Sequence, residues 1–478
     1  MNQTHKYTVI KKEILSDIRT PIEVLRILKG VSDHVYMLES VEDQVRWGRY
    51  TFLGYDPKMC ITCLNGKLKV TGKDKKIIKE ETVAHPADFI RETVREYSCE
   101  RLPDFPTFTG GLVGYFAYDY IKYSEPKLKL DAADEEHFMD VDLMLFDKVI
   151  CFDNLRQKIV VTAMVRTDAS DSEKEEARSD IDSTIDLIIN GEPKNIAPGT
   201  LTSDYRALFD EKQYCDMVER AKKYIYDGDI FQVVLSNRLE ADFEGSLFNT
   251  YRLLRTINPS PYMFYFSGDD IEVAGASPET LVKCEDGVLH TFPLAGTRPR
   301  GKDEKEDGEL EKELLADEKE RAEHNMLVDL GRNDIGKISR FGSVEVEKYM
   351  SIERYSHVMH IGSTVRGDLR SDRTALDAVD AVLPAGTLSG APKIRACEII
   401  NELENNKRGI YGGAIGYIDF TGNLDTCIAI RIAFKKNGKV FVRSGAGIVA
   451  DSVPENEYRE CINKAKAVMS AIKQQQEI

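Results

Sequence analysis

Several features are scarce in this 478-residue chain, and their scarcity excludes whole classes of protein. No apolar run approaches the roughly 20 residues of a membrane span. Residues 1–15 contain neither the apolar stretch nor the cleavage site of an export signal. Basic residues number 65 against 81 acidic ones, so the formal net charge is −16 and nucleic-acid phosphates would be repelled. We therefore expect a cytoplasmic protein that binds neither membranes nor nucleic acids.

The cysteines show no pattern typical of a metal site or a disulfide framework. The nine cysteines are scattered through apolar or mixed segments, and the single CxxC, Cys60 and Cys63, has no second pair to complete a zinc site. We expect reduced structural thiols.

What is present is an ordinary globular composition, with 42% hydrophobic and 31% charged residues. A chain of this length exceeds one compact core, so two domains or one large α/β unit are expected. Glycine, proline, asparagine and serine cluster near 190–205, which predicts a linker. The predicted domains are residues 1–195 and 205–478.

Periodicity predicts both helices and strands without a regular βαβ rhythm. Ile181, Ile185 and Ile188 recur at helical spacing, whereas Leu64–Asn65–Gly66 between two apolar runs is typical of a hairpin turn. The predicted class is α+β, with large, mainly antiparallel sheets sandwiched by outer helices.

Two predicted helices carry glutamates three residues apart, Glu320 with Glu323 and Glu457 with Glu460. This spacing places both carboxylates of a pair on one helix face. Such pairs usually decorate a solvated surface. If the two faces meet, however, they form an oxygen-rich site suited to Mg²⁺.

Three loops rich in small residues accompany these helices, at 293–301, 384–393 and 444–447. Each could be a tight turn, or it could offer backbone N–H groups to an anion. None matches a nucleotide-binding motif. His357 and His360 lie on a predicted strand and face opposite sides, so one could act as a base while the other is structural.

Taken in order, these segments resemble the chorismate-binding enzyme family. The resemblance is carried over 208–470 by FQVVLSNR, NPSPYMFYF, GASPET, PLAGTRPRG, ERAEHNMLVDLGRND, SHVMHIGSTVRG, LPAGTLSGAPK, GGAIGY and VRSGAGIVADSVPENEYRECINKA. In the first region, MLES at 37–40 and GRYTFLGYDP at 48–57 are similar to the regulatory half of family members that form anthranilate. The resemblance implies amination of chorismate by ammonia, followed by loss of pyruvate.

The resemblance also implies residue roles. Glu279 looks like the general acid for the departing ring hydroxyl, His360 like the group that serves pyruvate loss, and Thr297 like a residue lining the ring. Mg²⁺ would be held by Glu320, Glu323, Glu457 and Glu460. Chorismate, a dianion, would be bound by Gly296, Thr387, Tyr411, Arg431, Gly445, Gly447 and Lys464.

Two positions distinguish branches of the family. Gln232 stands where water-using relatives carry a lysine base, and Ala295 where aminodeoxychorismate-forming relatives carry a nucleophilic lysine. Both differences favour anthranilate formation from ammonia. The alternatives are an aminodeoxychorismate-forming component and a sensor without catalysis.

The resemblance further implies a tryptophan site for feedback inhibition and a separate glutamine amidotransferase subunit that supplies ammonia, and so a hetero-oligomer. The residues implied in tryptophan binding are Glu39, Ser40, Asn258, Pro261, Tyr262 and Met263.

Overall fold

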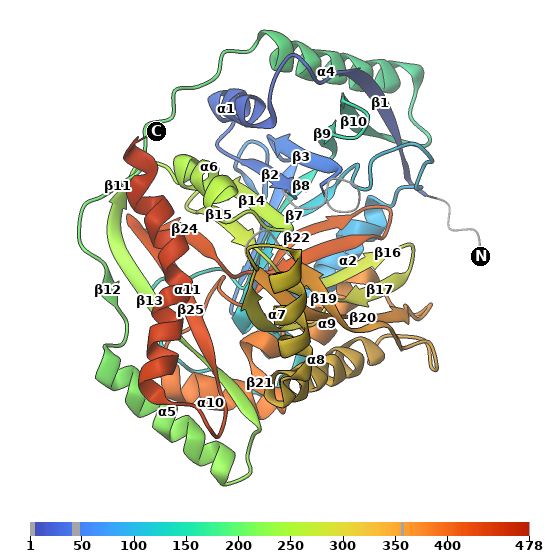
Figure 1. The fold of residues 1–478 in the computed structure, drawn as a ribbon. Helices are drawn as coiled ribbons and strands as arrows, with labels where there is room; N and C mark the ends of the chain where they lie inside the picture. Colours follow the sequence, from blue (N-terminus) through green and yellow to red (C-terminus); the bar gives the residue numbers. More distant parts are fainter. Residues whose placement is uncertain (1–4, 41–47, 355–357, 478) are drawn as a thin grey trace.

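The computed structural model describes residues 5–40, 48–354 and 358–477, which fold into two large β-sheets and surrounding helices (Figure 1). The thirteen-stranded first sheet runs in the order β1 (Tyr7–Leu15), β10 (Lys158–Arg166), β9 (Lys148–Asp153), β3 (Tyr50–Tyr55), β2 (Val35–Glu39), β14 (Tyr262–Ser267), β15 (Glu272–Ser277), β24 (Ile432–Lys436), β25 (Lys439–Ile448), β13 (Gln232–Glu244) and β11 (Thr200–Leu201). Two short strands, β12 (Arg206–Ala207) and β21 (Gly390–Ala391), also pair with β13.

The second sheet has twelve strands. Its order is β18 (Leu294–Pro299), β20 (Val358–Asp368), β17 (Val288–Thr291), β16 (Thr280–Glu285), β23 (Leu424–Ile428), β22 (Ala414–Asp419), β7 (Gly111–Phe116), β8 (Val141–Phe146), β4 (Met59–Leu64), β5 (Lys67–Gly72) and β6 (Ile77–Thr82), with β19 (Glu345–Arg354) paired to β20. Neighbouring strands in both described sheets pair antiparallel, for example β2 with β14 through Met37 and Tyr265. The predicted α+β class is confirmed.

Eleven α-helices are described, and they surround the sheets. They are α1 (Pro21–Val31), α2 (Pro86–Glu96), α3 (Ile121–Ser124), α4 (Asp171–Asn190), α5 (Glu211–Tyr226), α6 (Phe248–Ile257), α7 (Glu304–Ala316), α8 (Glu318–Gly336), α9 (Ala375–Val382), α10 (Lys393–Glu404) and α11 (Pro454–Gln474). Short 3₁₀ turns are η1 (Tyr118–Tyr120), η2 (Gly386–Leu388) and η3 (Gln475–Glu477). Within the described part, no helix is both long and apolar enough to cross a membrane.

Alternation along the strands explains the layers. On β2, Tyr36 packs into an aromatic core between the two sheets, whereas its neighbours Val35 and Met37 pack on the outer side beneath helices α1, α4, α6 and α11. Successive strand residues face opposite sides, so one strand serves two cores. The predicted sandwich is therefore built from both faces of each sheet.

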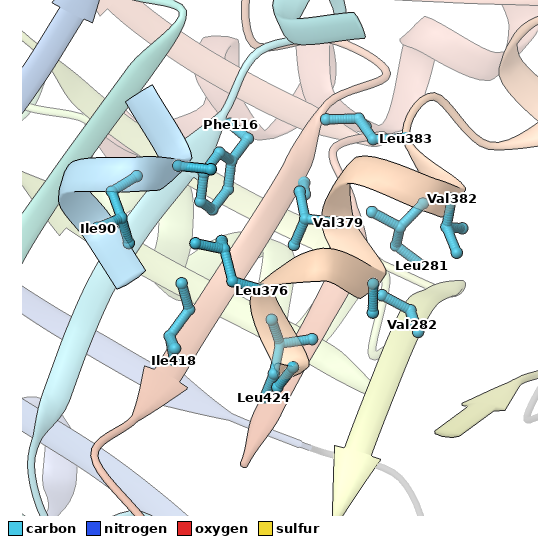
Figure 2. Packing of buried hydrophobic residues seen from close by; sticks show 14 of the residues in the cluster. Ile90, Phe116, Leu281, Val282, Leu376, Val379, Val382, Leu383, Ile418 and Leu424 are labelled. Atoms are coloured by element: carbon cyan, nitrogen blue, oxygen red, sulfur yellow. The ribbon is translucent and has the colours of Figure 1, made fainter. Parts of the chain in front are cut away.

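The two predicted domains do not have separate cores. Figure 2 shows Ile90 of α2 and Phe116 of β7 packed with Leu376, Val379 and Leu424 of the second region. Both sheets also contain strands from each region. The boundary near 190–205 does fall in the extended chain after α4, but pairing across the regions leaves fewer sheet edges exposed than two separate sheets would. The observed cores thus extend across the predicted boundary, and the assignment of residues 1–195 and 205–478 to two domains stays a prediction.

Candidate active site

Glu279 lies in the turn between β15 and β16, where strand pairing holds its backbone, because Ile428 N–H donates to its carbonyl at 3.0 Å. The Thr387 hydroxyl, from η2, donates to Glu279 Oε1 at 3.0 Å. Burial raises the pKa of Glu279 to about 7, and Thr387 and Lys464 oppose that shift only partly. A carboxyl group with this pKa can hold a proton near neutral pH and give it up, as a general acid must.

His360 and Thr297 face each other on paired strands, β20 and β18. His360 Nδ1 lies 2.9 Å from the Gly296 carbonyl oxygen and 3.1 Å from Thr297 Oγ1. A carbonyl only accepts, so Nδ1 carries the hydrogen and Nε2 bears the lone pair. Burial lowers the pKa of His360, which favours the neutral ring. Its partner in the sequence analysis, His357, lies outside the described residues.

Gly296 has φ +64°, which an L-residue with a side chain rarely adopts. A Cβ atom at this position would lie 3.1 Å from Glu320 Oε2. This irregularity within β18 therefore needs glycine both for its backbone conformation and for the close approach of α8.

Gln232 begins β13, beside the end of β25. Its side chain is buried, and its Oε1 has no hydrogen-bond partner among the described residues. A Cβ at Gly447 would lie 2.7 Å from Gln232 Nε2, and one at Gly445 would lie 3.2 Å from the Tyr411 hydroxyl. Both glycines thus let the polar side chains of Gln232 and Tyr411 approach the backbone of β25 closely.

Arg431 precedes β24 and has a left-handed backbone, φ +53°. Burial lowers its pKa, and Tyr411 opposes this shift. Arg431 also helps to lower the pKa of His360, so these three side chains share one neighbourhood. No carboxylate in the described part of the chain forms an ion pair with Arg431, which suits it to an incoming anion.

The glutamate pairs lie on α8 and α11, as expected, and the two helices bring them into electrostatic contact. Burial raises the pKa of Glu323, with further contributions from Glu320 and Glu460. Burial likewise raises the pKa of Glu457, and Glu460 adds to the effect. Lys464 lies among them, with Nζ 2.6 Å from Glu460 Oε1 and 3.2 Å from the Gly445 carbonyl oxygen.

This donor set has the chemistry of a hard-cation site, because a cation would stabilise the charged form of Glu323 and Glu457, whose pKa values burial and neighbouring carboxylates raise. Across residues 5–40, 48–354 and 358–477, however, no three His, Cys, Asp or Glu side chains stand close enough to hold an ion together. The residue types fit Mg²⁺, and its binding stays a prediction.

Sequence reasoning missed the residue that ties the 293–301 loop to α8. Arg298 reaches Glu313 at 3.1 Å, Asp317 at 3.0 Å and Glu320 at 3.8 Å. The signal was available in TRPR, because an arginine beside an acidic helix start is a common ion-pair arrangement. Arg298 fixes where the first glutamate of the α8 pair stands.

The residues expected to bind the inhibitor lie apart from this site, around a cavity of about 510 Å³ between strands of the two regions. Five of the six, Glu39, Ser40, Pro261, Tyr262 and Met263, are in its wall. Asn258 is not in the wall described; its side chain donates to the Ala276 carbonyl at 3.4 Å, at the end of α6.

Glu39 and Tyr262 are already engaged. The Arg255 Nε donates to Glu39 Oε1 at 2.5 Å, and the Tyr251 hydroxyl donates to the same oxygen at 2.5 Å. The Tyr262 hydroxyl donates to Asp425 at 2.8 Å. These bonds fix the wall of the cavity before any ligand enters.

The antiparallel sheets thus carry a buried carboxylic acid, a neutral histidine and an arginine that has no ion-pair partner among the described residues, with glutamate pairs on α8 and α11. The sequence profile of chorismate binding enzymes matches residues 46–470, and the chain belongs to this family.

The individual relatives sharpen that assignment. Over all of this chain and 98% of the relative, it is 44% identical to anthranilate synthase component 1 of Acetivibrio thermocellus. It is 45% identical to the protein of the same name from Aquifex aeolicus, over 99% and 96%. Among solved structures, anthranilate synthase component I from Streptococcus pneumoniae superimposes with a TM-score of 0.78 at 37% identity, covering 95% of this chain and 98% of that one.

A second structure shows the fold alone. The menaquinone-specific isochorismate synthase of Escherichia coli has a TM-score of 0.71 at 19% identity, covering 98% of this chain and 96% of its own. Proteins named for different reactions thus share this architecture, so the fold alone does not decide the reaction.

Proposed function

We propose that this chain is the synthase component of an anthranilate synthase, which converts chorismate and ammonia to anthranilate, pyruvate and water, the first step of tryptophan synthesis. The observation that carries the proposal is the full-length match, at 44% identity, to a protein named anthranilate synthase component 1. The contacts of the site support the chemistry.

Glu279 supplies the proton for the first step. Its pKa of about 7 leaves a substantial protonated fraction at neutral pH. Ammonia attacks the ring while the ring hydroxyl leaves, and the proton from Glu279 converts that hydroxyl to water. Thr387 holds the carboxyl group in place through Oε1.

Arg431 and Tyr411 bind the enolpyruvyl carboxylate of chorismate. A buried guanidinium without an ion-pair partner among the described residues gains a charge-assisted, two-pronged contact when a carboxylate arrives. Backbone N–H groups near Gly447 add donors. The arrangement therefore selects a substrate with a negatively charged group that can reach Arg431.

Glu320, Glu323, Glu457 and Glu460 would hold Mg²⁺, directly or through water, and Lys464 joins them. When bound, the cation neutralises the second carboxylate of chorismate, on the ring. Lys464 and the η2 turn around Thr387 steady the same end of the substrate.

His360 serves the loss of pyruvate. Its neutral ring, with Nδ1 held by Gly296, leaves the Nε2 lone pair as the acceptor for a ring proton. Removing that proton drives aromatisation as the ring C–O bond breaks and the enolate of pyruvate leaves, and a proton taken up at its methylene carbon gives pyruvate.

Two side chains set the choice of reaction. Gln232 is a neutral amide and cannot deprotonate water, which disfavours isochorismate. Ala295, on β18 opposite Ile361, has no nucleophile, which disfavours aminodeoxychorismate. Ammonia needs no base to become a nucleophile, so this pair favours anthranilate.

Two further features extend the proposal. Tryptophan binds in the cavity at Glu39 and inhibits the enzyme as the product of the pathway. All nine cysteines are free, and burial raises the pKa of each, so none is suited to release ammonia from glutamine. A glutamine amidotransferase component supplies the ammonia, and we expect the pair to work in the cytoplasm.

The test uses the purified chain with chorismate, Mg²⁺ and ammonium salt, with products separated and identified by mass. Anthranilate and pyruvate should form in equal amounts, and glutamine should not replace ammonium until the amidotransferase component is added. Isochorismate or aminodeoxychorismate as main product would refute the proposal. Glu279→Gln serves as the inactive control.

A further inference from the structure

Tyr262 lines the cavity of about 510 Å³, and it also contacts both ends of the turn that carries Glu279. Its backbone pairs with Ser277, the last residue of β15, where that turn begins. Its hydroxyl oxygen lies 3.0 Å from Oγ1 of Thr280, the residue directly after Glu279. One residue in the cavity wall thus touches the 277–280 turn on either side of its acidic side chain.

The direction of these hydrogen bonds follows from the phenol of Tyr262. Burial and the nearby Asp425 raise the pKa of Tyr262, so its hydroxyl keeps its hydrogen. That hydrogen is donated to Asp425 Oδ1 at 2.8 Å. The Thr280 hydroxyl therefore donates to the Tyr262 oxygen, because a phenol has only one hydrogen to give. The result is a chain of two bonds, from Thr280 through Tyr262 to Asp425.

This chain of bonds joins two cavities. Tyr262 and Asp425 are in the wall of the cavity of about 510 Å³. Thr280 is in the wall of a smaller one, of about 50 Å³, together with Glu279 and its hydrogen-bond partner Thr387. The bond between Tyr262 and Thr280 therefore runs from the wall of the larger cavity to the wall of the space that holds the acid.

The sheet is firmly held beyond Thr280 but irregular at Thr280 itself. Leu281 and Val282, which follow it, are buried in the core drawn in Figure 2. The register of β16 on β23 shifts between Thr280 and Val282, and such irregularities are places where a strand can re-aim a side chain. A movement of Tyr262 is therefore taken up by the 277–280 turn and not by the packed strand behind it.

Glu39, in the same cavity wall, has polar contacts that lead elsewhere. Its carboxylate accepts hydrogen bonds from Tyr251 and Arg255, which both lie on α6. Tyr262, by contrast, is bonded to the residue next to the acid. This contrast distinguishes a contact that can hold a ligand from one that can report its presence to the active site.

We propose that the Tyr262–Thr280 hydrogen bond transmits occupancy of the larger cavity to Glu279, and that Tyr262 and Thr280 are positioning residues for this acid. A ligand that packs against the Tyr262 ring tilts it, and the hydroxyl end moves Thr280 and the turn with it. The Glu279 carboxyl group then loses its alignment with Thr387 and with the ring hydroxyl of chorismate. This inference rests on the proposed function, which makes Glu279 the acid and tryptophan the ligand.

The test separates tryptophan binding from tryptophan inhibition. Calorimetry gives the Kd for tryptophan, and kcat/KM for chorismate is then measured with ammonium at about 100 times that Kd. Wild type should keep about 1% of its kcat/KM, because about that fraction of the sites is free of ligand.

Thr280→Val removes the hydroxyl at nearly constant shape and leaves the bond from Tyr262 to Asp425 in place. It should therefore bind tryptophan within about threefold of wild type. At about 100 times its own Kd, however, it should keep about 10% or more of its uninhibited kcat/KM, because the bound ligand no longer displaces the acid. Inhibition of Thr280→Val to the wild-type level would overturn the link.

Two controls test whether the hydroxyl itself matters. Thr280→Ser keeps a hydroxyl at the same position and should be inhibited as wild type is. Thr426→Val removes a hydroxyl that donates to the Val282 carbonyl at 2.9 Å, between the same two strands but in neither cavity wall. It should also be inhibited as wild type is, and resistance in Thr426→Val equal to that of Thr280→Val would overturn the link.

A double-mutant cycle distinguishes one link from two separate effects. Tyr262→Phe keeps the ring and removes the other end of the bond. Each single substitution breaks the whole link, so the double variant should be no more resistant to tryptophan than the more resistant single variant. Resistance that multiplies in the double variant would overturn the link.

Absence of tryptophan binding to the wild-type chain would overturn it as well. Failure of the proposed function would look different, because the chain would then form no anthranilate from chorismate, Mg²⁺ and ammonium even without tryptophan.

Discussion

Two carboxylates in this molecule have pKa values that are shifted in opposite directions. Glu404, on α10, is fully buried, and its oxygens lie 2.5 Å from Arg408 and 2.7 Å from Arg443. Burial alone would raise the pKa of Glu404, yet the two guanidinium groups hold it below its usual value. By contrast, burial and neighbouring carboxylates raise the pKa of Glu323 on α8.

This difference in pairing distinguishes a carboxylate that stabilises the fold from carboxylates that are suited to bind a ligand. Around Glu404 every strong donor is used, since Ser236 N–H also donates to it at 2.7 Å, so the network needs nothing further. By contrast, among the described residues Glu323 forms no ion pair with a cation, and Arg431 forms none with a carboxylate. Such groups are costly to the fold and are retained where a ligand completes them.

The largest expected effect is on catalysis, from Glu323→Gln or Glu460→Gln. Each substitution removes one negative charge at nearly constant size, so activity should fall about 100-fold or more while the fold is retained. Mg²⁺ should also raise the melting temperature of wild type more than that of either variant, because binding to the native state stabilises it. Activity and thermal unfolding with and without Mg²⁺ check both statements.

Glu318→Gln is the matched control, because Glu318 is exposed on the same helix and outside the facing pairs. It should behave as wild type. Full activity in Glu323→Gln or Glu460→Gln would remove the basis for the cation site.

The structural network should show the reverse pattern. Glu404→Gln leaves Arg408 and Arg443 buried without their carboxylate, which should lower the free energy of unfolding by about 3–5 kcal/mol. Denaturant titration measures this loss. Glu402→Gln, on the same helix, weakens an exposed ion pair with Arg220 and a hydrogen bond from the Tyr224 hydroxyl, and should cost about 0–1 kcal/mol. Equal losses in the two variants would contradict the comparison.

The sequence predicted local structure well and long-range structure poorly. Glutamate spacing predicted the helices that became α8 and α11, and the Asn65–Gly66 turn predicted the β4–β5 hairpin. Both signals depend on residues that are close together in the sequence. The pairing of β2 with β14, which joins the two regions, depends on register between strands over 200 residues apart, which periodicity does not encode.

The same limit applied to the site. Motif residues such as Glu279 and Thr387 were placed together by resemblance, and the structure gives their hydrogen bond. Arg298 was missed because TRPR shows an arginine near an acidic helix start, but only the packing of β18 against α7 and α8 gives its partners Glu313 and Asp317. The roles of the site residues stay predictions until variants are measured.

Glu279 lies between these two cases, because it is a buried carboxyl group with one hydrogen bond, from the Thr387 hydroxyl. Its protonation should appear in the pH dependence of the reaction. Because its pKa is raised to about 7, the protonated acid predominates below pH 7 and declines tenfold per unit above. Free ammonia increases tenfold per unit over the same range. At fixed, subsaturating total ammonium, kcat/KM for chorismate should therefore rise with pH up to about 7 and then level off.

Expressed per concentration of free NH₃, the same data should be flat below pH 7 and fall above it. A rise that continues unchanged through pH 8 would show that Glu279 is not needed in its protonated form. Thr387→Val should shift the break to higher pH, because the Thr387 hydroxyl lowers the pKa of Glu279.

The smallest effect on catalysis is expected at the second cavity, where Glu39 is a paired carboxylate like Glu404 yet lines a ligand-sized space. If pairing there only fixes the wall, a neighbouring side chain can block the ligand without disturbing the active site. Ser40→Phe should raise the tryptophan concentration for half-inhibition about tenfold or more, since loss of one well-packed contact costs at least about 1.4 kcal/mol. The activity of Ser40→Phe without tryptophan should stay near that of wild type.

The control is Ser172→Phe, which places the same ring on the exposed face of α4 and should be inhibited as wild type is. Unchanged inhibition in Ser40→Phe would move the tryptophan site elsewhere, whereas joint loss of activity and inhibition would show that the cavity and the active site depend on the same packing.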